Sequence, residues 1–140
     1  MNYNPANQRE INEAISAGER SLASLGQAKE ELRKARNLGI WDMLGGRGLV
    51  TFLKQTHIRD AQSSIERARY ELQCFSHTLN DVNSFSGIDL GISDFLIFAD
   101  YFFDGIIADF MVQQKINQAA DNVDEAIRRV NNILYRLKNM

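Results

Sequence analysis

Apolar residues recur at alternating intervals of three and four along much of this chain of 140 residues. One uninterrupted series consists of Ile58, Ala61, Ile65, Ala68, Leu72, Phe75, Leu79 and Val82. Another series consists of Ile116, Ala119, Val123, Ala126, Val130, Ile133 and Leu137. Because residues at this spacing share one side of an α-helix, each series predicts a long helix that packs along an apolar face, as in a coiled coil.

A further series predicts an N-terminal helix over about residues 5–37. Its buried side is expected to carry Ile11, Ile15, Leu22, Leu25 and Leu32, together with the small residues Ala14, Gly18, Ala28 and Ala35. Small residues would let a neighbouring helix approach closely. Asn4 followed by Pro5 is a favourable helix start, and Gly39 suits the left-handed residue that often ends a helix.

These patterns predict an all-α protein, a single domain over residues 1–140 with long helices at about 5–37, 57–83 and 94–138. The connector 38–56 is rich in glycine but also apolar, so we expect it to fold back against the bundle. At 1.5 Å per residue the third helix would be about 68 Å long, well beyond the first two. No glycine or proline forces a break at 112–115, so we expect an unbroken third helix and a homodimer that covers its overhang.

Composition narrows the functional classes. Hydrophobic residues make up 44% of the chain and charged residues 24%, as in ordinary globular proteins. The net charge of −2 offers no electrostatic basis for binding nucleic acid. The single cysteine, Cys74, excludes an internal disulfide and fits a reducing, cytoplasmic location. The first ten residues lack the apolar core of a secretory signal.

The segment 95–112, "FLIFADYFFDGIIADFMV", places Asp100, Asp104 and Asp109 among five phenylalanines. On membrane-insertion scales three central aspartates cost about 7–10 kcal/mol, more than the about 3–6 kcal/mol gained from the apolar residues. We therefore expect no transmembrane segment. In a helix Asp100 and Asp104 share one face, whereas Asp109 lies nearly opposite.

Carboxylates inside an apolar segment need hydrogen-bond donors or ion-pair partners, because an unpaired buried charge is strongly unfavourable. The connector supplies such groups, and we expect it to meet the face that carries Asp100 and Asp104. The candidate residues for this pairing, or for binding a ligand or partner, are Trp41, Arg47, Lys54, His57, Asp100 and Asp104.

Motifs for catalysis or cofactor binding are weak. His57 and Asp60 in "HIRD" stand three residues apart and offer two metal ligands, but neither histidine follows a glutamate by three residues, as di-iron bundles require. "GGRG" at 45–48 follows a helix and lacks the phosphate-loop pattern, which favours a turn. Cys74 has no neighbouring base in sequence. The sequence therefore predicts no catalytic residue, metal ion or cofactor, and favours a protein that is not an enzyme.

At "GIWDMLGGRG", "IRDAQ" and "FADYFFDGIIADF" the chain resembles a family of small, all-helical bacterial proteins without an assigned function. The likeness covers most of the chain and implies an all-helical fold. These motifs encode no known chemistry, so the resemblance implies nothing further about activity.

The leading functional hypothesis is a non-enzymatic helical interaction or scaffold module that forms a homodimer or binds a protein partner. The alternative is a bundle that binds a small ligand or metal through the Asp100 and Asp104 face, with His57 or Lys54. A third reading is peripheral attachment to a membrane through the aromatic segment 95–112.

Overall fold

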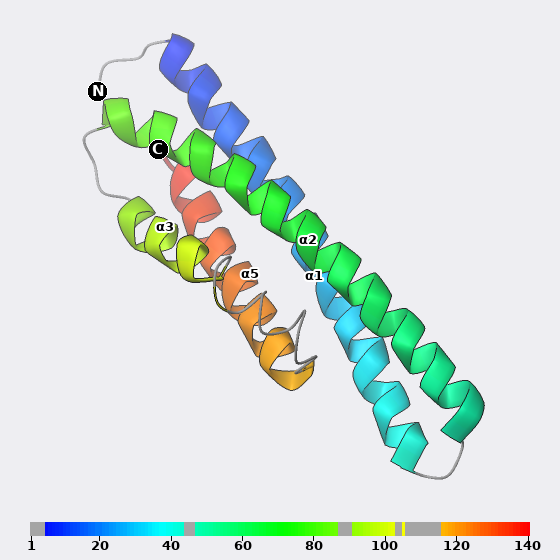
Figure 1. The fold of residues 1–140 in the computed structure, drawn as a ribbon. Coiled ribbons are helices and arrows are strands. Elements are labelled where there is room, and N and C mark those ends of the chain that lie inside the picture. Colours follow the sequence, from blue (N-terminus) through cyan, green and yellow to red (C-terminus); the bar gives the residue numbers. More distant parts are fainter. Residues whose placement is uncertain (1–4, 44–46, 87–90, 103–104, 106–115) are drawn as a thin grey trace.

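The computed structural model is all-α: its described residues form four helices and no strand (Figure 1). The helices are α1 (Pro5–Met43), α2 (Arg47–Ser86), α3 (Ile92–Tyr101) and α5 (Ile116–Lys138). The structure describes the backbone of residues 5–43, 47–86, 91–102, 105 and 116–140, and the side chains of these residues except those of 5–6, 38–55 and 85–86.

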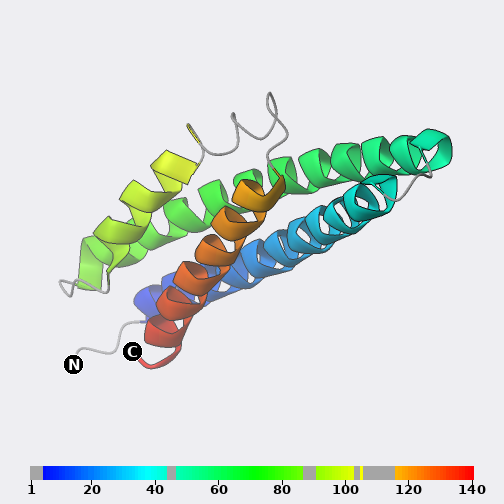
Figure 2. The same cartoon turned by 90° about the horizontal axis from the view of Figure 1, so that it is seen from below.

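Helices α1 and α2 form a long antiparallel hairpin. The ion pair between Arg20 and Glu71 (3.4 Å) and the contact between Glu31 and His57 (3.3 Å) fix this direction, because the partner number falls as the α1 number rises. We call residues 14–35 and 58–82 the base of the hairpin. Helical residues 36–43 and 47–56 are its tip, which projects beyond the other helices in both views (Figure 1, Figure 2).

The predicted apolar face of α2 is confirmed. All eight residues of the series from Ile58 to Val82 are buried, with at most 3% of their surface exposed. The series on α5 is also buried except for Ile116, which is partly buried. On α1, Leu25 and Leu32 are fully buried, whereas Ile11, Ile15 and Leu22 are only partly buried.

The inner side of α1 is formed mainly by small residues. Ala14, Ala17, Ala28, Ala35 and Ser21 are completely buried. Gly18 is the closest point of approach, since a Cβ atom there would lie 2.7 Å from Leu134 Cδ2 and 3.0 Å from Phe75 Cε1. Glycine at this position therefore lets α1 contact both α2 and α5.

The prediction of one unbroken helix over 94–138 is wrong, because α3 and α5 run in opposite directions (Figure 1, Figure 2). The start of α3 at Gly91 lies beside Arg136 near the end of α5, and the Arg129 guanidinium lies 4.5 Å from the Phe98 ring centre. This reversal lets both helices bury their apolar faces on the base of the hairpin. It also removes the overhang that suggested a homodimer.

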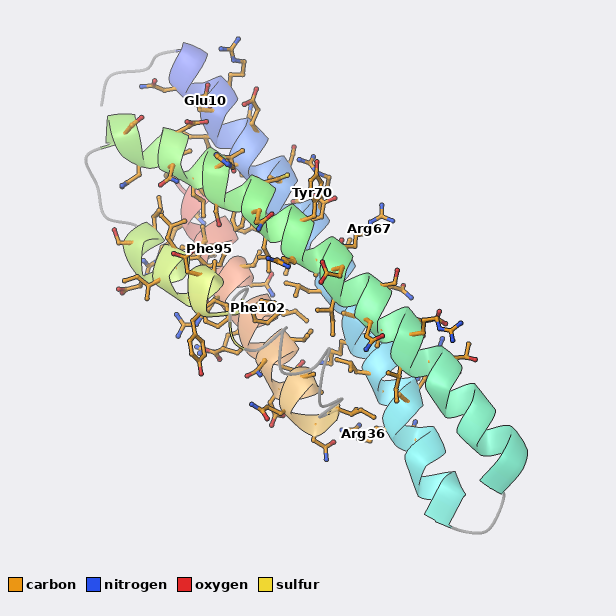
Figure 3. All side chains as sticks on the ribbon, in the orientation of Figure 1. Glu10, Arg36, Arg67, Tyr70, Phe95 and Phe102 are labelled. Carbon is orange, nitrogen blue, oxygen red and sulfur yellow. The ribbon has the colours of Figure 1, made fainter. Side chains whose placement is uncertain are left out.

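Phenylalanines on one side of α3 explain the aromatic segment. Phe95 and Phe102, labelled in Figure 3, are almost completely buried. Phe95 meets Phe75 of α2 edge to face, with ring centres 5.4 Å apart, and Phe98 follows at 6.4 Å. Asp100 lies on the exposed side of the same helix, so its carboxylate needs no buried partner.

The predicted connector 38–56 also differs from the structure. Helix α1 continues through Gly39 to Met43, and α2 already begins at Arg47. A glycine inside a helix costs only about 1 kcal/mol relative to alanine. This cost is too small for Gly39 or Gly48 to end a helix. The segment expected to fold back over the bundle is therefore mostly the helical tip of the hairpin.

Candidate functional site

Three potential metal-ligating side chains converge between α1 and α2. His57 and Asp60 lie one helical turn apart on α2, and Glu31 reaches them from α1. Ligand atoms of the three side chains all lie within 4.8 Å of one another. Among the residues whose side chains the structure describes, this is the only such group of three or more.

Glu31 is the unusual member of this group, because only 7% of its surface is exposed. Its two carboxylate oxygens have different neighbours. Oε1 accepts a hydrogen bond from the Gln27 amide at 3.0 Å and lies 3.7 Å from the Lys34 ammonium. Oε2 faces His57 Nδ1 at 3.3 Å. One oxygen is thus held within α1, and the other points across to α2.

Exposure increases through the cluster from α1 to α2. The His57 side chain is 27% exposed, and Asp60 is exposed. The cluster is therefore anchored on a buried carboxylate and open to water on its Asp60 side. Such an arrangement can act as an ion pair between helices or can hold a cation.

A second feature is an open groove of about 570 Å³ between α2 and α3. It is lined by Tyr70, Gln73, Cys74, Ser76, His77, Asn80, Leu96 and Asp100. A hydrogen bond with the Cys74 thiol is the main reason that the pKa of Tyr70 lies above its usual value. No hydrogen bond joins Cys74 to His77 in the described part of the chain. Among the described residues that line the groove, Cys74 and His77 are therefore not hydrogen-bonded as a nucleophile and its base would be.

The structure does not bring the sequence-predicted site together. Asp100 lies in the groove beside Cys74 and His77. His57 precedes Cys74 by 17 residues on the same straight helix, a separation of about 25 Å at 1.5 Å per residue. Asp100 therefore does not meet His57, which was one of several candidate partners for it. The side chains of Trp41, Arg47 and Lys54, and all of Asp104, lie outside the described residues.

Sequence reasoning identified His57 and Asp60 as a weak ligand pair but missed Glu31. A signal was present, because Ala17, Ser24 and Glu31 follow one another at intervals of seven on the side of α1 that the other small residues share. A charged residue at such a position is expected to be buried and to need a partner. Only the pairing of α1 with α2 shows that the partner is His57.

Comparisons with protein-family models, with curated proteins and with solved structures give no match. In the described part of the chain, no helix combines the length and the apolar character that crossing a membrane requires.

Proposed function

We propose that this protein is a non-enzymatic helical interaction module that forms a homodimer through the tip of the α1–α2 hairpin. The observation that carries the proposal is that α3 and α5 do not reach the tip (Figure 1, Figure 2). Lys29 of α1 pairs with Asp124 of α5 at 2.8 Å, and α5 begins eight residues before Asp124. This places its start close to Arg36, where the tip begins, as Figure 3 illustrates.

The sequence of the tip supports a partner on its outside. The spacing of the buried series on α2 can be continued back from Ile58 in steps of four, three and four residues. The positions reached are Lys54, Thr51 and Arg47, which we call the inner positions of the tip on α2. Counting on from Ala35 by seven, α1 holds Asp42. The apolar residues fall mostly at the other register positions: Ile40, Trp41, Met43, Leu49, Val50, Phe52 and Leu53.

A helical hairpin with apolar residues at outer register positions is typical of a surface that binds another protein. A second copy of the chain is the occupant we propose. Two tips would together supply four short helical segments, enough to enclose an apolar core between them. The same surface would be used by both copies, as in most symmetric dimers.

The proposal is tested by measuring mass in solution with sedimentation equilibrium at tens of micromolar protein. The chain has a mass of 15.9 kDa, and we expect about twice that value. Val50→Glu combined with Leu53→Glu should return the mass to that of one chain. The matched control is Ile97→Glu with Tyr135→Glu, which adds the same charge at described residues that are 69% and 70% exposed.

Each outcome bears on the proposal. A dimer that survives in the control variant and is lost in the tip variant supports it. A wild-type mass of one chain at these concentrations contradicts self-association. Loss of the dimer in the control variant, with a tip variant that stays dimeric, would place the interface on α3 or α5 and contradict the proposed surface.

The alternative function is a ligand or metal site on the Asp100 and Asp104 face, of which the structure describes only Asp100. Asp100 belongs to no group of three potential ligand side chains among the described residues. The groove beside it is open and has no hydrogen bond from Cys74 to His77. We therefore propose one function.

A further inference from the structure

We propose that Glu31, His57 and Asp60 form a binding site for a divalent transition-metal ion of the Zn²⁺ class. The three side chains come from two helices that the fold holds in fixed register. The proposal concerns the junction between the base and the tip and is independent of dimerisation through the tip.

The distance between Glu31 Oε2 and His57 Nδ1 lies within the range of a hydrogen bond, and it also matches the spacing of two ligand atoms around one metal ion. The observed distance is 3.3 Å. Zinc binds nitrogen and carboxylate oxygen at about 2.0–2.2 Å in a tetrahedron, so two of its ligand atoms lie about 3.3–3.5 Å apart. The two atoms are thus spaced as ligands of one ion.

The types of ligand decide which ions suit the site. Imidazole nitrogen and carboxylate oxygen are both zinc ligands, whereas Ca²⁺ requires six to eight oxygens and Mg²⁺ an octahedral set. Asp60 is exposed, and its ligand atom, within 4.8 Å of the others, can approach by a side-chain rotation. Three protein ligands would leave the fourth position of a tetrahedral ion to water.

The neighbours of Glu31 hold its carboxylate in a suitable orientation. The Gln27 amide donates to Oε1 at 3.0 Å, which leaves Oε2 directed toward His57. Hydrogen bonds of this kind to a ligand carboxylate commonly strengthen metal binding. The Lys34 ammonium, 3.7 Å from Oε1, acts against a cation, but its side chain is 43% exposed and can move into water.

The test is isothermal titration calorimetry of the untagged, EDTA-treated full chain with ZnCl₂. We expect one Zn²⁺ per chain, with no heat of binding for MgCl₂ or CaCl₂. His57→Gln and Glu31→Gln should each weaken binding by about 10-fold or more, and Asp60→Asn by less because Asp60 is exposed. Circular dichroism confirms that each variant is folded.

The chain supplies matched controls for the two other residues that bind zinc readily. His77→Gln changes the only other histidine, which lies on α2 outside the cluster, and Cys74→Ser removes the only thiol. Neither variant should alter the affinity. Lys34→Met should bind Zn²⁺ several-fold more tightly, because it removes a positive charge near the carboxylate.

The proposal is overturned if wild-type protein shows no saturable binding at micromolar Zn²⁺. It is equally overturned if His57→Gln binds as tightly as wild type, or if His77→Gln or Cys74→Ser abolishes binding. Weaker binding by Lys34→Met would show that Glu31 is not a ligand and would also contradict the site.

Discussion

The base and the tip of the α1–α2 hairpin are both helical, but the positions that continue the buried series of the base carry different residue types in the tip. In the base, the inner positions of α2 are apolar from Ile58 to Val82 and are completely covered. In the tip, the equivalent positions hold Lys54, Thr51 and Arg47. The polarity of the repeat therefore changes between Ile58 and Lys54, next to the Glu31–His57–Asp60 cluster.

This difference explains where α5 packs. A helix gains stability by burying its apolar face, and the base offers small residues such as Ala28 and Gly18 against which α5 can lie closely. The inner positions of the tip offer no comparable apolar series. The comparison teaches that the length of a helix does not determine how far its neighbours extend along it. The distribution of apolar residues does.

The largest expected effect is the loss of Phe75 from the base. Phe75 is fully buried and its ring contacts Phe95 of α3. Phe75→Ala should lower the free energy of unfolding by about 3–5 kcal/mol, as is usual for a buried phenylalanine. Urea denaturation at low protein concentration measures this change. Phe52→Ala in the tip is the comparison, and a loss as large as that of Phe75→Ala would remove the distinction between the two ends.

A pair of glycines on α1 tests the close packing of the base. A Cβ atom at Gly18 would lie 2.7 Å from Leu134, whereas nothing lies within 4 Å of one at Gly26. Gly26→Ala should raise stability by up to about 1 kcal/mol through helix propensity. Gly18→Ala should lose that gain through overpacking and be less stable than Gly26→Ala by about 1–3 kcal/mol. Equal thermal stability of the two variants would show that α5 packs less closely than described.

Glu31 lies close to the junction of the base and the tip, and replacing it tests whether a buried carboxylate there stabilises the base. Glu31→Leu removes a carboxylate from a buried position and extends the apolar side of α1. We expect the metal-free protein to gain about 1 kcal/mol of stability, because the Glu31 charge is costly to bury, whereas Lys34 and His57 are exposed enough to stay hydrated without it. Thermal unfolding in EDTA measures this. A lower melting temperature would show that the contact between Glu31 and His57 itself stabilises the base.

The smallest effect is expected from Glu125 on the outer side of α5. Hydrogen bonding to Arg128, with a further contribution from Arg129, lowers the pKa of Glu125 below its usual value of 4.5. A lowered pKa in the folded state means that the contribution to stability is present above about pH 4.5 and disappears as the pH falls below it. Thermal unfolding of wild type and Glu125→Gln should therefore differ slightly at pH 6, and the difference should shrink as the pH is lowered below 4.5. A difference that persists at low pH would show another cause.

The sequence predicted the all-α class and the buried residues of α2. A series of apolar residues at intervals of three and four lies on one side of an α-helix, and that side is the one that is buried. The sequence also predicted most of the buried side of α5. Two features were not predictable in this way. Helices α3 and α5 run in opposite directions although no proline separates them. This arrangement is favourable because it lets both helices bury their apolar faces on the base. Helices α1 and α2 also pass through Gly39 and Gly48, whose effect on helix stability is small.

The candidate cluster was only half predictable. His57 and Asp60 are close in sequence, so their spacing is visible in "HIRD". Glu31 is 26 residues away from His57 and belongs to the other helix of the hairpin. Its contact depends on the register between α1 and α2, which apolar spacing alone does not determine. His57 was a candidate partner of Asp100 because the connector was expected to fold back over the bundle, whereas most of that segment is helical.

The central claim is that the base is covered within one chain and that the tip is covered only by a second copy. Hydrogen–deuterium exchange measured over a range of protein concentrations tests it most directly. We predict slow exchange of amides in 14–35 and 58–82 at every concentration, and exchange in 36–43 and 47–56 that is fast in dilute protein and slows as concentration rises. Equally slow exchange of the tip in dilute, monomeric protein would contradict the account.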